Sequence, residues 1–322
     1  MRSCLLPVVL VAVATGCPLR PPELLRGPDR PDVPLLGLLD PAAEVTVFVR
    51  PAALLASPLG STAEGWFEPT PEDASRGGPA QWFRELGGAE EALVSFLGED
   101  DPDLTRAARG GEDAGRTLAL RFAERADAEG ASAAPVPCAD VTAWVAGTTQ
   151  VAAVGAELFV AGPQGLVDAA CRRAAGRETA SLAADPRTAP LLARLDFAAA
   201  QIAYVGRVPA PLRPRLRHWG LDPLVDRVVV ASVSVAAEQT AVRLVADVDD
   251  EASAAALVQS ATEGLEFAAS RRSFQLAGLS RLIRQLAARS DGRFFFLEGN
   301  LPTPVVAVVL STLRTVEEAA PE

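Results

Sequence analysis

The sequence predicts an α+β fold of two related halves, each a mostly antiparallel sheet covered by helices. Short segments in which apolar and polar residues alternate are joined by tight turn sequences, which is typical of antiparallel strands. Longer segments with apolar residues at helical spacing follow them. The Leu-Asp-rich phrase before the first strand returns about 156 residues later, which indicates an internal duplication.

The first half is expected over 36–192. Its first strand is 44–50, where three valines alternate with Thr46 and Phe48. Pro51 suits the first turn of a short helix that runs to Leu59. The other expected elements are a loop over 60–80, helices over 81–86 and 89–97, a strand over 117–125, a loop over 126–137, strands over 141–146, 150–154 and 157–161, and helices over 164–175 and 185–195.

The second half is expected over 193–322 and restarts with a strand over 201–206, then a proline-started segment over 209–212. Asp249 or Asp250 should cap a helix that ends near Phe267, since a carboxylate at this position accepts backbone N–H groups of the first turn. The other expected elements are strands over 227–236 and 239–247, an amphipathic helix over 274–289, a strand over 293–298 that Gly299 and Asn300 end, and a last helix over 303–319.

Residues 1–16 predict a signal peptide. Arg2 precedes an apolar core over 5–14 that is too short to span a bilayer. Small residues then lead into Cys17, and this junction resembles a lipoprotein signal, in which the cysteine becomes the first residue and carries lipid. The alternative is an ordinary secretory signal that is cut after Ala14. The proline-rich segment 17–35 would tether the folded body.

The chain has four cysteines, at positions 4, 17, 138 and 171. Cys4 leaves with the leader. If Cys17 carries lipid, Cys138 and Cys171 remain, and we predict a disulfide between them because export places them where disulfides persist. The rival interpretation is two unrelated buried thiols. A cut after Ala14 would instead leave three cysteines, an awkward number in an oxidising compartment.

Composition excludes some classes of function. Hydrophobic residues make up 49% of the chain, enough for a sizeable core. The formal charge of −11 disfavours binding to nucleic acid and to anionic lipid surfaces. Every basic residue is arginine, and together with the alanine and proline content this suggests a high-GC genome.

The order of an acidic-proline start, strand, small helix, meander and then the phrase over 181–185 (SLAAD) resembles uncharacterised envelope lipoproteins of high-GC Gram-negative bacteria, which have a duplicated α+β body. The resemblance covers most of 36–319 and rests on pattern. It implies a lipid-anchored envelope protein and carries over no catalytic residue. Pro18, in the position after the cysteine, implies by the same resemblance the periplasmic side of the outer membrane.

No catalytic constellation stands out, so we predict that the protein is not an enzyme and has no catalytic residue. The single histidine, His218, lies among arginines that lower its basicity, and we interpret it as a surface or helix-end residue. No serine lies in a Gly-x-Ser-x-Gly turn.

We predict no metal and no cofactor. The acidic residues over 99–103 and 247–251 could offer oxygens to calcium, but neither cluster matches an EF-hand, and helix capping explains the second. Two aromatic pairs, Trp66-Phe67 and Trp82-Phe83, flank an acidic loop. We expect them to anchor that loop rather than form an exposed interaction patch.

The leading hypothesis is therefore a non-enzymatic lipoprotein of the cell envelope with a partner-binding or structural role. Its expected partners are the membrane, through the lipid on Cys17, and an envelope protein, with no nucleic acid. Without lipidation the protein would be secreted or periplasmic. The alternative is a carrier of a lipid or other apolar ligand, which would need a continuous apolar cavity. A hydrolase, the third hypothesis, would need His218 or paired carboxylates in one cleft.

Overall fold

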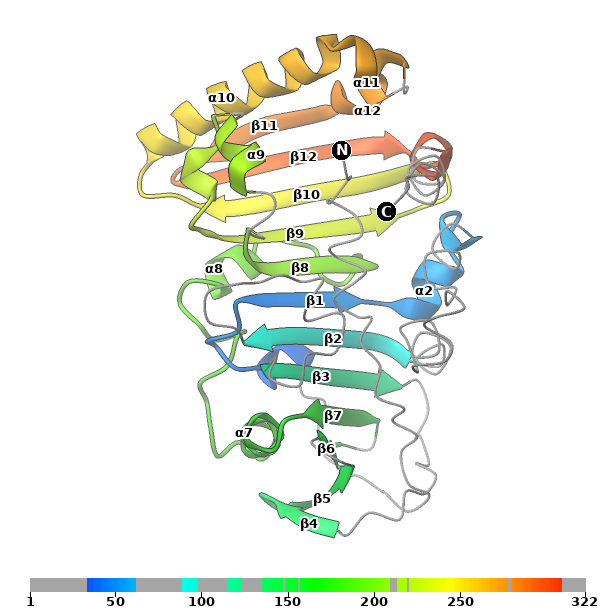
Figure 1. Cartoon of the computed structure of the whole chain (residues 1–322), viewed down its shortest axis with the longest axis vertical. Coiled ribbons are helices and arrows are strands. Elements are labelled where there is room, and N and C mark those ends of the chain that lie inside the picture. The colour runs from blue at the N-terminus through cyan, green and yellow to red at the C-terminus, as the bar shows by residue number, and fades with distance from the viewer. Residues whose placement is uncertain are drawn as a thin grey trace, which may run out of the picture. The chain divides into compact units, whose positions relative to one another are not determined.

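The structure is a computed structural model that describes residues 34–61, 89–97, 115–122, 135–146, 149–155, 157–208, 213–218, 220–276 and 279–308. These residues form two compact units. The N-terminal unit contains the described residues within 34–52 and 89–190, and the C-terminal unit contains those within 53–61 and 191–308. Each unit combines antiparallel strands with helices, so the predicted α+β class is confirmed (Figure 1).

The sheet of the N-terminal unit has the spatial strand order β1-β2-β3-β7-β6-β5-β4, and every pair in it is antiparallel. Its strands are β1 (Val45–Val49), β2 (Ala89–Leu97), β3 (Gly115–Phe122), β4 (Pro135–Cys138), β5 (Val141–Ala146), β6 (Thr149–Ala153) and β7 (Leu158–Gly162). The other elements that begin in this unit are η1 (Leu35–Gly37), α2 (Pro51–Leu55), α7 (Gln164–Ala174) and α8 (Ala189–Leu192). All five residues of β1 are buried, so this strand lies in the core.

β2 corrects the predicted helix over 89–97. Alanine, glutamate and leucine at its start favour a helix. In the structure, β2 lies between β1 and β3, with Val94 opposite Val47 on one side and Leu118 on the other. Residues 92–95 are all buried, so contacts on both faces override the local preference.

β4 corrects the end of the predicted loop over 126–137. Cys138 pairs with Val141 around a two-residue turn, so Val136 also exchanges its backbone hydrogen bonds with β5. By the same alternation, the backbone groups of Pro135 and Pro137 face away from β5. β4 is the last strand of its sheet in the described order, which is the place where proline is tolerated.

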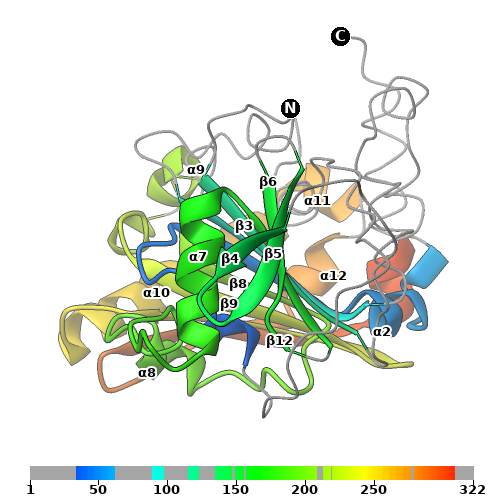
Figure 2. The same ribbon diagram turned by 90° about the horizontal axis from the view of Figure 1, so that it is seen from below.

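α7 is the predicted helix over 164–175. It ends as predicted at Gly176, which has a φ of 68°. Gly176 N–H donates to the Arg173 carbonyl at 2.9 Å, and Arg177 N–H donates to the Arg172 carbonyl at 2.8 Å. These two bonds form a Schellman motif. The buried side of α7 packs against β4, β6 and β7, and Figure 2 shows the helix standing alongside the strands at this end of the sheet.

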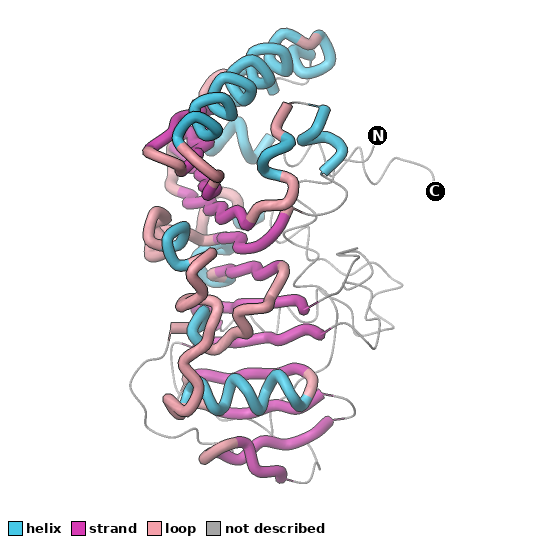
Figure 3. Tube along the Cα trace, turned by 90° about the vertical axis from the view of Figure 1, so that its left-hand side faces the viewer, coloured by secondary structure: helices cyan, strands magenta, loops and turns pink. Residues whose placement is uncertain are grey.

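The sheet of the C-terminal unit has the order β11-β12-β10-β9-β8 and is also antiparallel. Its strands are β8 (Ile202–Arg207), β9 (Val228–Val235), β10 (Gln239–Asp247), β11 (Leu286–Asp291) and β12 (Phe294–Pro302). Its helices are α9 (Arg213–His218), η4 (Asp222–Leu224), α10 (Glu251–Ser270), α11 (Arg272–Leu276), α12 (Leu279–Ile283) and one that begins at Thr303 and is described to Val308. α10 packs on β11 and β12 at the end of this sheet (Figure 3).

β11 and β12 correct two further predictions. The predicted helix over 274–289 is replaced by α11, α12 and then β11, which starts at Leu286. β12 continues through Gly299 and Asn300 to Pro302, because it pairs with β10 along its whole length. Gly299 is a place of close approach: a Cβ there would lie 2.4 Å from the carbonyl oxygen of Gln285.

The two units share a strand order. β1 and β8 each precede a helical segment and two antiparallel strands, β2 and β3 or β9 and β10. Further strands follow in each unit, and the last of them pairs with the third strand. β7 pairs with β3 in the N-terminal unit, and β12 pairs with β10 in the C-terminal unit. A helix then follows, which is α7 or the helix that begins at Thr303. The predicted starting strands over 44–50 and 201–206 therefore occupy equivalent places.

Candidate functional site

Several residues singled out from the sequence lie outside the described residues. These are Cys17 with the leader and most of the tether, the acidic cluster over 99–103, and the two Trp-Phe pairs. His218 is the last residue of α9.

Cys138 and Cys171 form the predicted disulfide. Their Cα atoms are 5.9 Å apart, within the usual range for a disulfide. Both cysteines are buried. Cys138 is the last residue of β4 and Cys171 lies on the buried side of α7. The bond therefore ties the outermost described strand of the N-terminal unit to the helix that covers its sheet.

A polar contact accompanies the disulfide. Gln150 on β6 is 1% exposed, and its Nε2 donates to Oδ1 of Asp168 at 3.0 Å. The same Asp168 oxygen lies 3.4 Å from the Cys138 sulfur. This contact joins α7 to the sheet beside the covalent link, so the disulfide sits in a packed, structural setting.

The acidic residues of the cluster over 247–251 cap a helix and form ion pairs. Asp250 accepts the Ser253 N–H at 2.7 Å, which caps α10 and lowers the pKa of that carboxyl group. Asp247 pairs with Arg293 at 2.8 Å, and Asp249 pairs with an arginine as well. Among the described residues, no group of three or more His, Cys, Asp or Glu side chains is placed to hold a metal ion.

A buried arginine that sequence reasoning missed joins three segments of the N-terminal unit. The side chain of Arg173, on α7, is 4% exposed. Its guanidinium donates to Glu178 at 2.5 Å and to Asp40 at 3.3 Å. It also donates to the carbonyls of Leu38 at 3.2 Å and Ala180 at 2.7 Å. Arg173 thereby fixes the segment before β1 to α7.

The SLAAD phrase lies against the same segment. The N–H of Leu182 donates to the Leu39 carbonyl at 3.1 Å. Asp185, which closes the phrase, accepts from the backbone N–H of Arg187 at 2.7 Å and from its guanidinium at 3.1 and 2.9 Å. The Arg187 guanidinium holds the pKa of Asp185 below its ordinary value of 3.8, against the opposing effect of burial.

Replacing Asp185 by Asn is expected to lower the free energy of unfolding by about 1 kcal/mol at pH 7, since Arg187 is largely exposed and water screens the pair. The lowered pKa means that ionised Asp185 stabilises the fold above pH 3.8. This contribution is lost as the pH falls through the lower, folded-state value.

Urea unfolding between pH 7 and pH 2 tests this expectation, because the difference between the two proteins should shrink as the pH falls below 3.8. Glu157→Gln removes an exposed charge from the same unit and serves as the control. A difference that stays constant over the whole pH range would assign the effect to packing instead.

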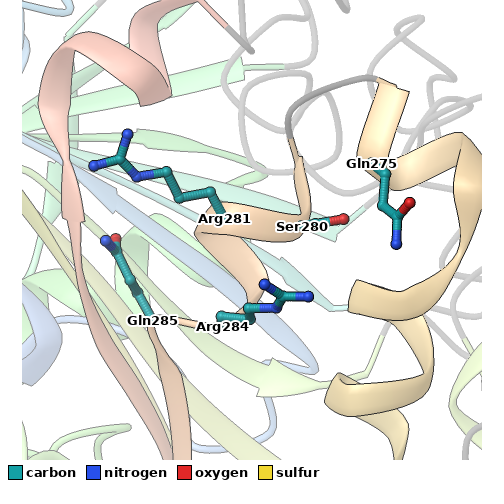
Figure 4. Close-up of a pocket in the computed structure, with 5 residues that line it drawn as sticks. All are labelled: Gln275, Ser280, Arg281, Arg284 and Gln285. Atoms are coloured by element: carbon teal, nitrogen blue, oxygen red, sulfur yellow. The ribbon is translucent and has the colours of Figure 1, made fainter.

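The described residues also form a polar pocket in the C-terminal unit, with a volume of about 620 Å³. It is lined by Gln275, Ser280, Arg281, Arg284 and Gln285, from α11, α12 and the turn that follows (Figure 4). In Figure 4, Arg284 and Gln275 lie toward one end of the group, and Arg281 and Gln285 toward the other.

The pocket lies in a segment with segregated charge. Residues 267–290 include five arginines and no acidic residue, although the chain carries a net charge of −11. This charge pattern is visible in the sequence and was the signal that could have located the pocket. Each of the five lining residues carries an amide, hydroxyl or guanidinium group, whereas a lipid carrier is expected to have mainly apolar residues there.

These features define the class of protein as an α+β body with a buried structural disulfide and a polar, arginine-lined pocket. No helix among the described residues is long and apolar enough to cross a membrane.

No protein-family model and no curated protein matches the chain. Solved structures of TP0453 are similar at 11% identity. Crystal form I covers 88% of this chain and 98% of that one, with a TM-score of 0.42. Crystal form III covers 87% and 99%, with a TM-score of 0.44. Crystal form IV covers 87% and 97%, with a TM-score of 0.42.

Proposed function

We propose that the protein is a lipid-anchored component of the cell envelope, on the periplasmic side of the outer membrane, with a non-enzymatic role in binding a partner or in structure. The observation that carries the proposal is the Cys138–Cys171 disulfide. Disulfides persist in oxidising compartments and are rare in the cytosol, so the bond supports export of the chain.

The cysteine count supports the anchor. With Cys138 and Cys171 joined and Cys4 in the leader, Cys17 is the cysteine left over. Lipid on Cys17 would remove the odd thiol and explain the small residues before it. The proline-rich segment 17–35 would then hold the body away from the membrane.

The pocket in Figure 4 does not itself support the carrier alternative, because its five lining residues are polar or charged. A hydrolase would need an acid–base pair, and the acids of the second cluster are occupied by capping and ion pairs.

Replacing Cys17 by Ser is expected to move the protein from the outer-membrane fraction to the soluble periplasmic fraction, because serine cannot receive the thioether-linked lipid. Cell fractionation and mass spectrometry of the mature N-terminus measure the change. Cys4→Ser is the matched control, since it changes a cysteine that the proposal places in the removed leader.

The result that would refute the anchor is a Cys17→Ser protein that stays membrane-bound while the native mature chain starts at Thr15. Crosslinking in intact envelopes addresses the partner-binding role. A discrete adduct that forms with the native protein and is lost in the Cys17→Ser variant would support an envelope partner at the membrane.

A further inference from the structure

We propose that the pocket lined by α11 and α12 binds a phosphate group carried by a hydroxylated ligand, which is the chemistry of a glycerophosphate. This site goes beyond the proposed function and does not depend on the lipid anchor. It rests on the charge, the hydrogen-bonding state and the size of the pocket.

The described lining of the pocket combines two arginines with no acidic side chain. Arg281 and Arg284 make no ion pair among the described residues, although other arginines of the same unit do. The paired arginines are Arg227, Arg243, Arg289 and Arg293. Both side chains are exposed, so water screens their mutual repulsion, and an anion in the pocket would gain charge-assisted hydrogen bonds from them. Guanidinium groups also match the oxygen geometry of phosphate well.

Two of the neutral side chains that line the pocket already donate hydrogen bonds to backbone carbonyls. The Ser280 hydroxyl donates to the Ala269 carbonyl at 2.8 Å, and Nε2 of Gln275 donates to the Ser270 carbonyl at 3.1 Å. These bonds hold both side chains in place. The donors left for an anion are therefore mainly the two guanidinium groups and the Gln285 amide.

Gln285 indicates that the ligand also offers a donor. Its Oε1 is buried and has no hydrogen-bond partner in the part of the chain that the structure describes. An unpaired buried acceptor costs free energy, which a ligand hydroxyl would recover after a small rotation of the amide. A bare phosphate dianion has no proton to donate to this oxygen, whereas a glycerol or sugar phosphate has hydroxyl groups beside its phosphate.

The size agrees with a ligand larger than inorganic phosphate. A volume of about 620 Å³ lies within the range of small-molecule sites. Two sources carry this chemistry, a soluble glycerophosphate and the headgroup of phosphatidylglycerol, and the experiment separates them.

Binding is measured with the full chain carrying Cys17→Ser, which excludes any contribution from a lipid anchor. The probes are glycerol 3-phosphate, inorganic phosphate, and vesicles of phosphatidylcholine with and without phosphatidylglycerol. The Arg281→Gln and Arg284→Gln double variant is expected to bind glycerol 3-phosphate at least about tenfold more weakly. The reason is that it loses the charge-assisted hydrogen bonds from both guanidinium groups to the phosphate. Gln285→Met should weaken glycerol 3-phosphate binding more than inorganic phosphate binding.

The matched control is the Arg271→Gln and Arg272→Gln double variant, which removes the same charge from the adjacent segment but does not alter the pocket lining. It should bind within about twofold of the parent, and thermal melts verify that each variant is folded. Saturable binding of glycerol 3-phosphate supports the soluble source. Binding to phosphatidylglycerol vesicles alone supports the headgroup. No binding of either probe, or an equal loss in both double variants, overturns the proposal.

Discussion

Replacing Arg173 by Met is expected to lower the free energy of unfolding of the N-terminal unit by about 3 kcal/mol. The change leaves the Asp40 and Glu178 carboxylates without their buried partner and removes the donor from the Leu38 and Ala180 carbonyls. The two carboxylate side chains are 27% and 25% exposed, so water recovers part of the loss. For that reason we expect the lower end of the range for breaking a buried pair.

Arg172→Met is the matched control, because Arg172 is the neighbouring arginine and also pairs with Glu178, at 3.1 Å. Its side chain is 48% exposed, so the loss should be under about 1 kcal/mol. Urea unfolding followed by circular dichroism measures both variants. Equal losses would show that burial of the Arg173 guanidinium contributes nothing of its own.

Removing the disulfide by Cys138→Ala and Cys171→Ala together should lower the free energy of unfolding by about 3–4 kcal/mol in the chain-entropy model. The bond closes a loop between residues 33 positions apart, and its loss frees the unfolded chain. Because single domains are typically stable by about 5–15 kcal/mol, this is a large share of the total.

The urea midpoint of the oxidised protein, compared with that of the double variant, measures this effect. Adding a reductant should shift the native protein toward the variant and leave the variant itself unchanged. If the double variant unfolds at the same urea concentration as the oxidised protein, the bond does not stabilise the fold.

The sequence predicted the fold best where the alternation of residues and the turns agree. The predicted strands over 141–146 and 239–247 match β5 and β10 residue for residue. Prediction failed where distant pairing decides the structure. β2 contains helix formers but is buried between two strands, and β4 contains two prolines that are acceptable only at an edge. Local pattern cannot show which neighbours a segment will meet.

The same limit separates the site residues that the sequence predicted from those that it did not. The disulfide was predicted from the cysteine count and from the expected compartment, neither of which needs the fold. Arg173 was missed because its partner Asp40 lies 133 residues away, and no local pattern links them. The polar pocket depends on a turn after α12 that the sequence predicted as continuous helix.

The prolines of β4 have a consequence for how the molecule meets its neighbours. Pro135 and Pro137 occupy the positions whose backbone faces away from β5, and neither has an N–H group. A strand from another chain that approached β4 would find carbonyl acceptors but no donors. The disulfide at Cys138 also holds β4 to α7. Pairing of β4 with a strand of another molecule, which would extend the N-terminal sheet between molecules, is therefore disfavoured. This opposes aggregation at high protein concentration.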